Sequence, residues 1–139
     1  MGTALLSVCA MAQSKLTLNW SVREDMFTGM LANDQARFEK GVESLSKLGR
    51  FYPEVEVLAW QGTAEATRAV WAHEAGKPKD FRRHYAQSTT YFVQLRGLAA
   101  KDERAKFLLM IFEGATLVTI ADRLPEPVRT AAWDRSYKS

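Results

Sequence analysis

The sequence predicts an all-α fold of antiparallel helical hairpins, with five long helices and a short C-terminal helix. Apolar residues recur three and four positions apart over long stretches, and no useful length alternates with a period of two. The four prolines, at positions 53, 78, 125 and 127, all lie near segment ends, where they separate helices rather than interrupt them. With 139 residues and 47% hydrophobic content, the chain is long enough for a packed core.

The first two helices are expected over residues 22–31 and 35–51. Asn33 or Asp34 is the expected N-cap of the second helix, because a short polar side chain accepts hydrogen bonds from the free N–H groups of a first turn. Apolar stripes at helical spacing define the buried faces. They consist of Val22, Met26, Phe27, Met30 and Leu31 in the first helix, and of Phe38, Val42, Leu45, Leu48 or Gly49, and Tyr52 in the second.

The third and fourth helices are expected over residues 54–75 and 80–98. Pro53 suits the start of the third helix because its missing N–H has no partner in a first turn. Gly76 supplies the stop, and Asp80 is the expected cap of the fourth helix.

The fifth helix is expected over residues 102–124, and a short sixth helix over 128–137. The fifth is apolar almost all round, so we expect it to be the most buried element. Glu113, Gly114 and Thr116 interrupt its apolar run, which argues against a membrane span.

Small residues suggest an internal repeat. Gly41, Leu45, Leu48 and Pro53 follow Gly29 at offsets of 12, 16, 19 and 24. These are the offsets of the packing positions of a tetratricopeptide repeat, whose period is about 34 residues. Gly62 follows Gly29 after 33 residues. A small residue is needed at the positions of Gly29 and Gly62 because the two helices of one repeat approach closely there.

The chain therefore resembles degenerate tetratricopeptide-repeat (TPR-like) proteins, most clearly over residues 22–76. The segment Leu58-Ala59-Trp60-Gln61-Gly62 is similar to one that follows the proline in exported bacterial proteins of this type. The resemblance implies a short right-handed superhelix and a non-catalytic scaffold or adaptor that binds a protein or peptide. It also implies a groove lined by the first helix of each repeat, for which the candidates are Arg23, Phe27, Trp60, Glu65 and Arg68. Because a short repeat array leaves its end helices incompletely covered, self-association is a natural extension.

Residues 1–12 have the pattern of a signal-peptide remnant. An apolar stretch precedes Ala10-Met11-Ala12, an A-x-A cleavage pattern, and is too short to span a bilayer. We therefore expect a single domain over residues 13–139 in a periplasmic or extracellular protein. The alternative is an apolar N-terminus that packs on the domain of a cytoplasmic protein. The one cysteine, Cys9, excludes an intrachain disulfide.

A second class of function, an enzyme or a ligand-binding bundle, depends on Glu113 and a histidine. Glu113 lies within an apolar helix, where a carboxylate needs a partner or a raised pKa. Its role is then acid–base chemistry with His73 or His84, or a ligand anchor. The plainer interpretation is an ion pair between helices. The spacing of histidines, cysteine and glycines matches no metal or cofactor motif, so we expect neither. The candidate partners for the ion pair are Arg68, Arg83 and Arg96.

A basic patch of Lys77, Lys79, Arg82 and Arg83 lies around the start of the fourth helix. Such a patch with interleaved aromatic residues can bind an anion or nucleic acid. Nucleic acid is not the expected partner, because the net charge is only +3 and the aromatic residues fit the buried stripe.

Overall fold

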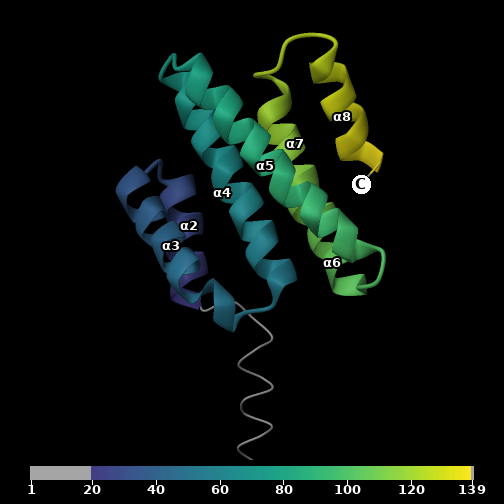
Figure 1. Cartoon of the computed structure of the whole chain (residues 1–139). Coiled ribbons are helices and arrows are strands. Elements are labelled where there is room, and N and C mark those ends of the chain that lie inside the picture. Colours follow the sequence, from purple (N-terminus) through teal and green to yellow (C-terminus); the bar gives the residue numbers. More distant parts are fainter. Residues whose placement is uncertain (1–19, 139) are drawn as a thin grey trace, which may run out of the picture. The chain divides into compact units, whose positions relative to one another are not determined.

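The computed structural model describes residues 20–138, and it is helical throughout this part except for short turns (Figure 1). Within these residues there is no strand, which confirms the all-α prediction. The predicted signal-peptide remnant, residues 1–12, lies outside the described part. The described residues divide into two compact units, unit 1 up to Val57 and unit 2 from Leu58 onward. None of the described helices is long and apolar enough to cross a membrane.

Unit 1 is a helical hairpin of α2 (Trp20–Leu31) and α3 (Gln35–Leu48), extended by a 3₁₀ turn, η1 (Gly49–Phe51). Asp34 caps α3, because its carboxylate accepts a hydrogen bond from the backbone N–H of Arg37 at 3.0 Å. Asn33 adopts a positive φ of 54°, which an asparagine tolerates in a tight turn. Both helix ranges follow the apolar periodicity that predicted them.

Two glycines bring α2 and α3 close together. A Cβ on Gly29 would lie 2.5 Å from the backbone nitrogen of Phe38, and a Cβ on Gly41 would lie 2.6 Å from Cγ of Met26. Phe38 and Met26 are themselves almost fully buried. The prediction that Gly29 is a close-packing position is therefore confirmed for this hairpin.

The apolar stripe of α2 is only partly buried. Val22 and Met26 are buried, whereas Phe27 and Leu31 are exposed. The sequence predicted that all of these residues face the core. The close contact with α3 covers only the side of α2 that carries Met26 and Gly29.

Ion pairs also join the two helices of unit 1. Asp25 of α2 pairs with Arg37 and Lys40 of α3, each at 3.1 Å. The ammonium of Lys40 and then the guanidinium of Arg37, both hydrogen-bonded to Asp25, hold the pKa of that carboxyl below its usual range. The charged form of Asp25 is therefore stabilised by the hairpin.

Unit 2 contains most of α4 (Glu54–Glu74), then α5 (Pro78–Ala99) and α8 (Val128–Lys138), with a divided helix between the last two. Gly76 ends α4 with a φ of 67°, which confirms the predicted stop. The predicted cap of α5 is wrong: the cap is Lys77, whose side chain makes no capping hydrogen bond. Pro78 at the first position starts the helix earlier, so Asp80 lies in its first turn.

The divided helix comprises α6 (Glu103–Leu108), a π-helical segment η2 (Leu109–Glu113) and α7 (Gly114–Ala121). It is not the most buried element, contrary to the prediction. It contacts α5, its α7 part contacts α8, and Phe112 of η2 packs against Trp60 of α4, but part of its surface is exposed. Four of its large apolar side chains are exposed: Phe107, Met110, Ile111 and Val118.

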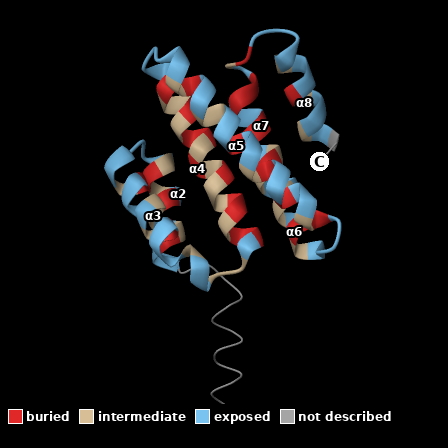
Figure 2. Cartoon of the chain, in the orientation of Figure 1, coloured by how far each residue is buried: buried red, intermediate tan, exposed pale blue. Residues whose placement is uncertain are grey.

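The core of unit 2 combines small residues of α4 with large residues of α5 and α7. Phe81, Leu117 and Ile120 pack in one buried cluster with alanines of α4 and α8 (Figure 2). Gly62 of α4 faces the ring of Phe92 on α5, because a Cβ there would lie 2.8 Å from it. Ser88 also donates a hydrogen bond to the carbonyl of Gly62 at 2.8 Å. The close approach predicted at Gly62 is confirmed, and it places one face of α5 beside the cavity described next. The alanines of this cluster are Ala66, Ala69, Ala72, Ala121 and Ala132.

Candidate functional site

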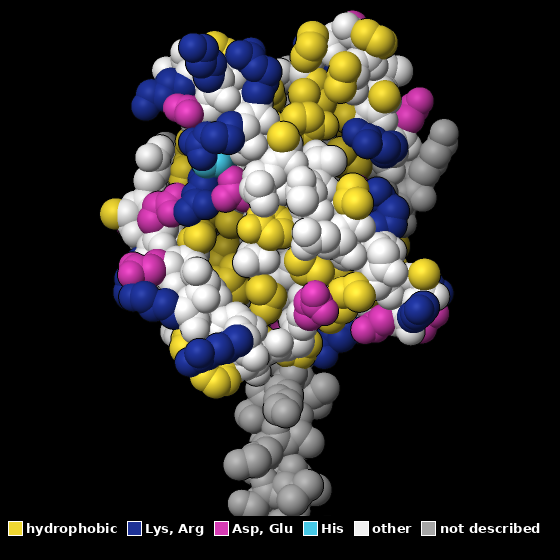
Figure 3. Space-filling model, in the orientation of Figure 1, with side chains coloured by type: hydrophobic (Ala, Val, Ile, Leu, Met, Phe, Trp, Pro, Cys, Tyr) yellow, Lys and Arg dark blue, Asp and Glu magenta, His cyan; other side chains and the backbone are white. Residues whose placement is uncertain are grey.

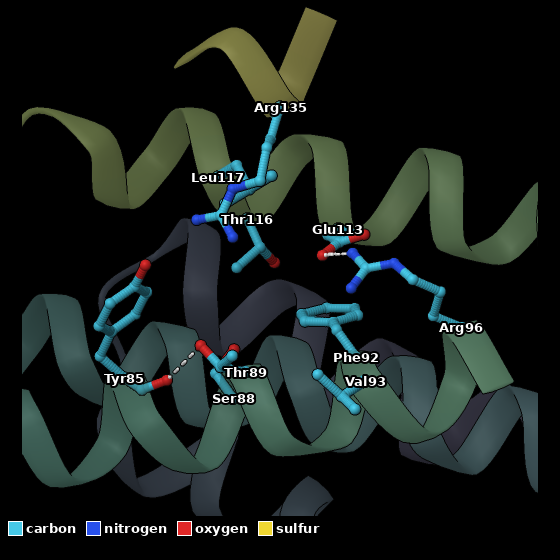
Figure 4. A pocket seen from close by; sticks show the side chains of 10 residues that line it. All are labelled: Tyr85, Ser88, Thr89, Phe92, Val93, Arg96, Glu113, Thr116, Leu117 and Arg135. Atoms are coloured by element: carbon cyan, nitrogen blue, oxygen red, sulfur yellow. Dashed lines mark hydrogen bonds and ion pairs between the residues drawn. The ribbon is translucent and has the colours of Figure 1, made fainter. Parts of the chain in front are cut away.

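A small cavity of about 80 Å³ lies in unit 2 between α5, η2, α7 and α8 (Figure 4). Its apolar surface comes from Phe92, Val93 and Leu117, and charged side chains from three elements enter it. It is lined by Tyr85, Ser88, Thr89, Phe92, Val93 and Arg96 of α5, Glu113 of η2, Thr116 and Leu117 of α7, and Arg135 of α8.

Glu113 is the buried charge of this cavity. Its side chain is only 9% exposed and forms an ion pair with the guanidinium of Arg96, which is 51% exposed. The plainer sequence interpretation, an ion pair between helices, is therefore confirmed, and Arg96 is the partner. Because a buried carboxylate without a partner is costly, this pair accounts for a charged residue inside an apolar helix.

The π-helical segment explains why Glu113 points toward α5. A π segment contains one extra residue in a turn, and one residue corresponds to a rotation of about 100° in an α-helix. The insertion ends at Glu113, so the carboxylate is rotated away from the exposed side of the helix that carries Ile111 and Met110. Segments of this kind occur frequently at functional sites.

The polar groups of the cavity carry a formal net charge of +1. Arg96 and Arg135 contribute two positive charges, and Glu113 contributes one negative charge. Figure 4 shows Arg135 reaching down from α8 toward Thr116, and Glu113 facing Arg96. Two of the hydroxyls are already used as donors: Ser88 to the carbonyl of Gly62, and Thr89 to the carbonyl of Tyr85. Ser88 and Thr89 therefore do not offer a free hydroxyl hydrogen to the cavity.

Neither histidine lines the cavity, so the acid–base set of Glu113 with a histidine is not assembled. His84 contacts Glu65 of α4 through Nδ1 at 2.6 Å and Arg83 through Nε2 at 3.1 Å. His73 packs edge-on against the ring of Phe81, with centroids 5.5 Å apart. Both histidines have structural contacts between α4 and α5.

The candidate groove residues are divided between the two units. Within unit 2, Glu65 forms a 2.6 Å ion pair with Arg68 and also contacts His84. Trp60 is half-buried against Phe112, with ring centroids 5.3 Å apart, so it packs between α4 and η2. The structure thus brings Glu65 and Arg68 together in one polar cluster and places Trp60 in a packing role.

Arg23 and Phe27 belong to unit 1. The guanidinium of Arg23 lies over the ring of Trp20 at 5.4 Å from its centroid, and Phe27 is 51% exposed. These two residues thus lie on α2, with aromatic surface available beside a positive charge.

The basic patch is exposed at the start of α5. Lys77, Lys79, Arg82 and Arg83 are all exposed, and Figure 3 shows Lys and Arg side chains gathered over the turn between α4 and α5. Arg83 forms an ion pair with Asp80 at 3.3 Å. A group of three or more possible metal ligands is not found within residues 20–138.

Comparison with protein-family models, curated proteins and solved structures finds no match to this chain. Sequence reasoning identified Glu113 but missed Phe92, Val93 and Arg135 as its neighbours in the cavity. Helical periodicity gave no signal for this contact, because it orders residues within one helix, whereas Phe92 and Val93 come from α5 and Arg135 comes from α8.

Proposed function

We propose that the chain is a non-catalytic helical-repeat module, TPR-like in its packing, that binds a partner protein or peptide. In this proposal the cavity beside Arg96 and Glu113 receives one side chain of the partner. The observation that carries the proposal is a side-chain-sized cavity with a buried ion pair on its wall and no histidine in its lining.

The size of the cavity favours a partner side chain over a free metabolite. Sites for small molecules usually enclose about 300–1,000 Å³. The cavity here has about 80 Å³, which is sufficient for the end of one side chain and a few waters. A polypeptide gains the rest of its binding energy from the surface around the cavity.

The charge of the cavity favours an acidic side chain. The guanidinium of Arg96 carries several N–H donors, and its ion pair with Glu113 uses Nη2. A carboxylate from the partner accepts hydrogen bonds from the other N–H groups of Arg96, and guanidinium–carboxylate hydrogen bonds are among the stronger ones in proteins. The apolar walls, Phe92, Val93 and Leu117, contact the methylene groups of that side chain.

The packing of the helices supports a repeat protein. Gly29 and Gly62, which lie 33 residues apart, each meet a phenylalanine of the following helix at very short range. Repeats of this kind expose helix faces for binding, and large apolar side chains on α2, among them Trp20 and Phe27, remain exposed.

Selection from a displayed random peptide library tests the proposal. We expect the wild-type chain to enrich peptides that share an acidic residue. Val93→Trp should abolish the enrichment, because Val93 is 55% exposed at the cavity and a larger side chain there covers it. Arg135→Glu should remove the preference for acidic residues, because it reverses one charge of the cavity.

Val128→Trp is the matched control, since Val128 is 43% exposed on α8 and does not line the cavity. This variant should enrich the same peptides as the wild-type chain. Equal enrichment by Val93→Trp, or no shared sequence among peptides selected by the wild-type chain, would disprove the proposal.

A further inference from the structure

The divided helix of unit 2 is apolar on two sides. Its inner side contributes Leu117, Ile120 and Ala121 to the buried cluster. Its outer side, here called the outer stripe, carries four large apolar side chains that are each 44–57% exposed, together with the exposed Ala115. The outer stripe consists of Phe107, Met110, Ile111, Ala115 and Val118. A helix that is apolar all round is normally covered on both sides, and contiguous exposed apolar surface commonly marks an interaction site.

We infer that a second copy of this chain covers the outer stripe, with the two divided helices antiparallel across a twofold axis near Ile111. A twofold interface uses the same surface on both copies, so that surface must complement itself when it is reversed. The outer stripe meets this requirement in charge and in shape.

Two exposed side chains of opposite charge flank the outer stripe. Lys101 precedes it and Asp122 follows it, and both are exposed. Within residues 20–138, neither side chain makes a hydrogen bond or an ion pair. Antiparallel pairing brings Lys101 of one copy near Asp122 of the other, twice in each dimer. The opposed helix dipoles favour the same orientation.

The side chains between these two charges are complementary in size. With the axis at Ile111, Phe107 of each copy faces Ala115 of the other, and Ile111 faces its own equivalent. From Phe107 to Val118 the one charged residue is Glu113, which is buried and paired with Arg96 on α5. The centre of the contact therefore contains no unpaired charge.

A cysteine placed near the axis tests the contact. In a Cys9→Ser background, Ile111→Cys should form a disulfide-linked dimer under mild oxidation with copper phenanthroline, because equivalent residues meet near a twofold axis. Val93→Cys is the matched control on α5, with a similarly exposed side chain, and should stay monomeric. Sedimentation equilibrium of the wild-type chain should give about twice the mass of one 15.7 kDa chain at high protein concentration.

Charge reversal tests the antiparallel orientation of the two divided helices and needs no change in the outer stripe. Lys101→Asp and Asp122→Lys should each weaken the dimer several-fold, and the double variant should restore it, since the two sites face each other across the interface. A wild-type chain that stays monomeric at all concentrations would overturn the inference. So would failure of Ile111→Cys to cross-link, or a double variant as weak as the single ones.

Discussion

Glycine at helix contacts is the residue-scale feature that the sequence predicted best. Offsets in the sequence marked Gly29 and Gly62 as close-packing positions, and both lie against a phenylalanine of the next helix. Gly114, further along the chain, has no such contact, because a Cβ there would lie 4.0 Å from its nearest neighbour, the carbonyl oxygen of Ser136. Gly114 directly follows the π segment.

Replacing two helical glycines, Gly29 and Gly97, by alanine should therefore have opposite effects on the stability of the chain. Gly29→Ala places a Cβ against the backbone of Phe38, which cannot move without separating α2 from α3, and should cost about 1–3 kcal/mol. A Cβ on Gly97 of α5 would have no neighbour within 4 Å. Gly97→Ala should therefore raise the free energy of unfolding by about 0.5–1 kcal/mol. Denaturant unfolding of both variants measures the difference. A Gly29→Ala chain as stable as wild type would contradict the close packing.

The burial and pairing of Glu113 could be predicted from the sequence, but its neighbours in the cavity could not. Its apolar surroundings indicated a buried, paired carboxylate, and the structure pairs it with one of the three arginines considered. The cavity beside it depends on side chains from α5, α7 and α8. Only tertiary packing brings these together, and the extra residue of η2 sets the direction of the carboxylate.

At the scale of elements, helix boundaries were predictable because caps and breakers are local. Asp34, Gly76 and Pro78 each lie within two residues of a helix end in the structure. The division of the fifth helix was not predictable, since a π segment leaves the apolar composition of a helix unchanged. The predicted burial of that helix was wrong because composition shows only that a side chain is apolar. Packing decides whether α5 or α8 covers it.

The α2–α3 hairpin should depend on the charge of Asp25. The pKa of Asp25 is lowered below 3.8, chiefly by its hydrogen bond with Lys40 and then by Arg37. A lowered pKa in the folded state means that the ion pairs stabilise unit 1 above pH 3.8, and that this contribution is lost as the pH falls through the folded pKa.

Acid unfolding of Asp25→Asn measures that contribution. The variant should be less stable than wild type at neutral pH, and the difference should shrink as the pH falls below 3.8. Lys40→Met removes the hydrogen bond that lowers the pKa of Asp25 most. This variant should also be less stable than wild type at neutral pH, and its difference from wild type should also shrink in acid. Parallel stability curves for wild type and Asp25→Asn over the whole pH range would contradict this account.

At the scale of the whole molecule, the two units have separate tasks in the proposed function. Unit 1 presents exposed aromatic surface on α2, and unit 2 contains the cavity and the outer stripe. The cavity and the outer stripe use different residues of the divided helix, so binding of a partner and self-association need not compete. The repeat in the sequence indicated hairpins with close helix contacts, but it carried no information on the charge of the cavity.

Hydrogen exchange of the full chain, with and without a peptide selected on it, tests the central proposal most directly. Binding at the cavity should slow amide exchange in residues 85–96 of α5 and residues 113–117 of η2 and α7, because the partner side chain contacts both segments. Exchange in α3, which does not line the cavity, serves as the internal reference. Protection confined to segments that do not line the cavity, or no protection at a saturating peptide concentration, would contradict it.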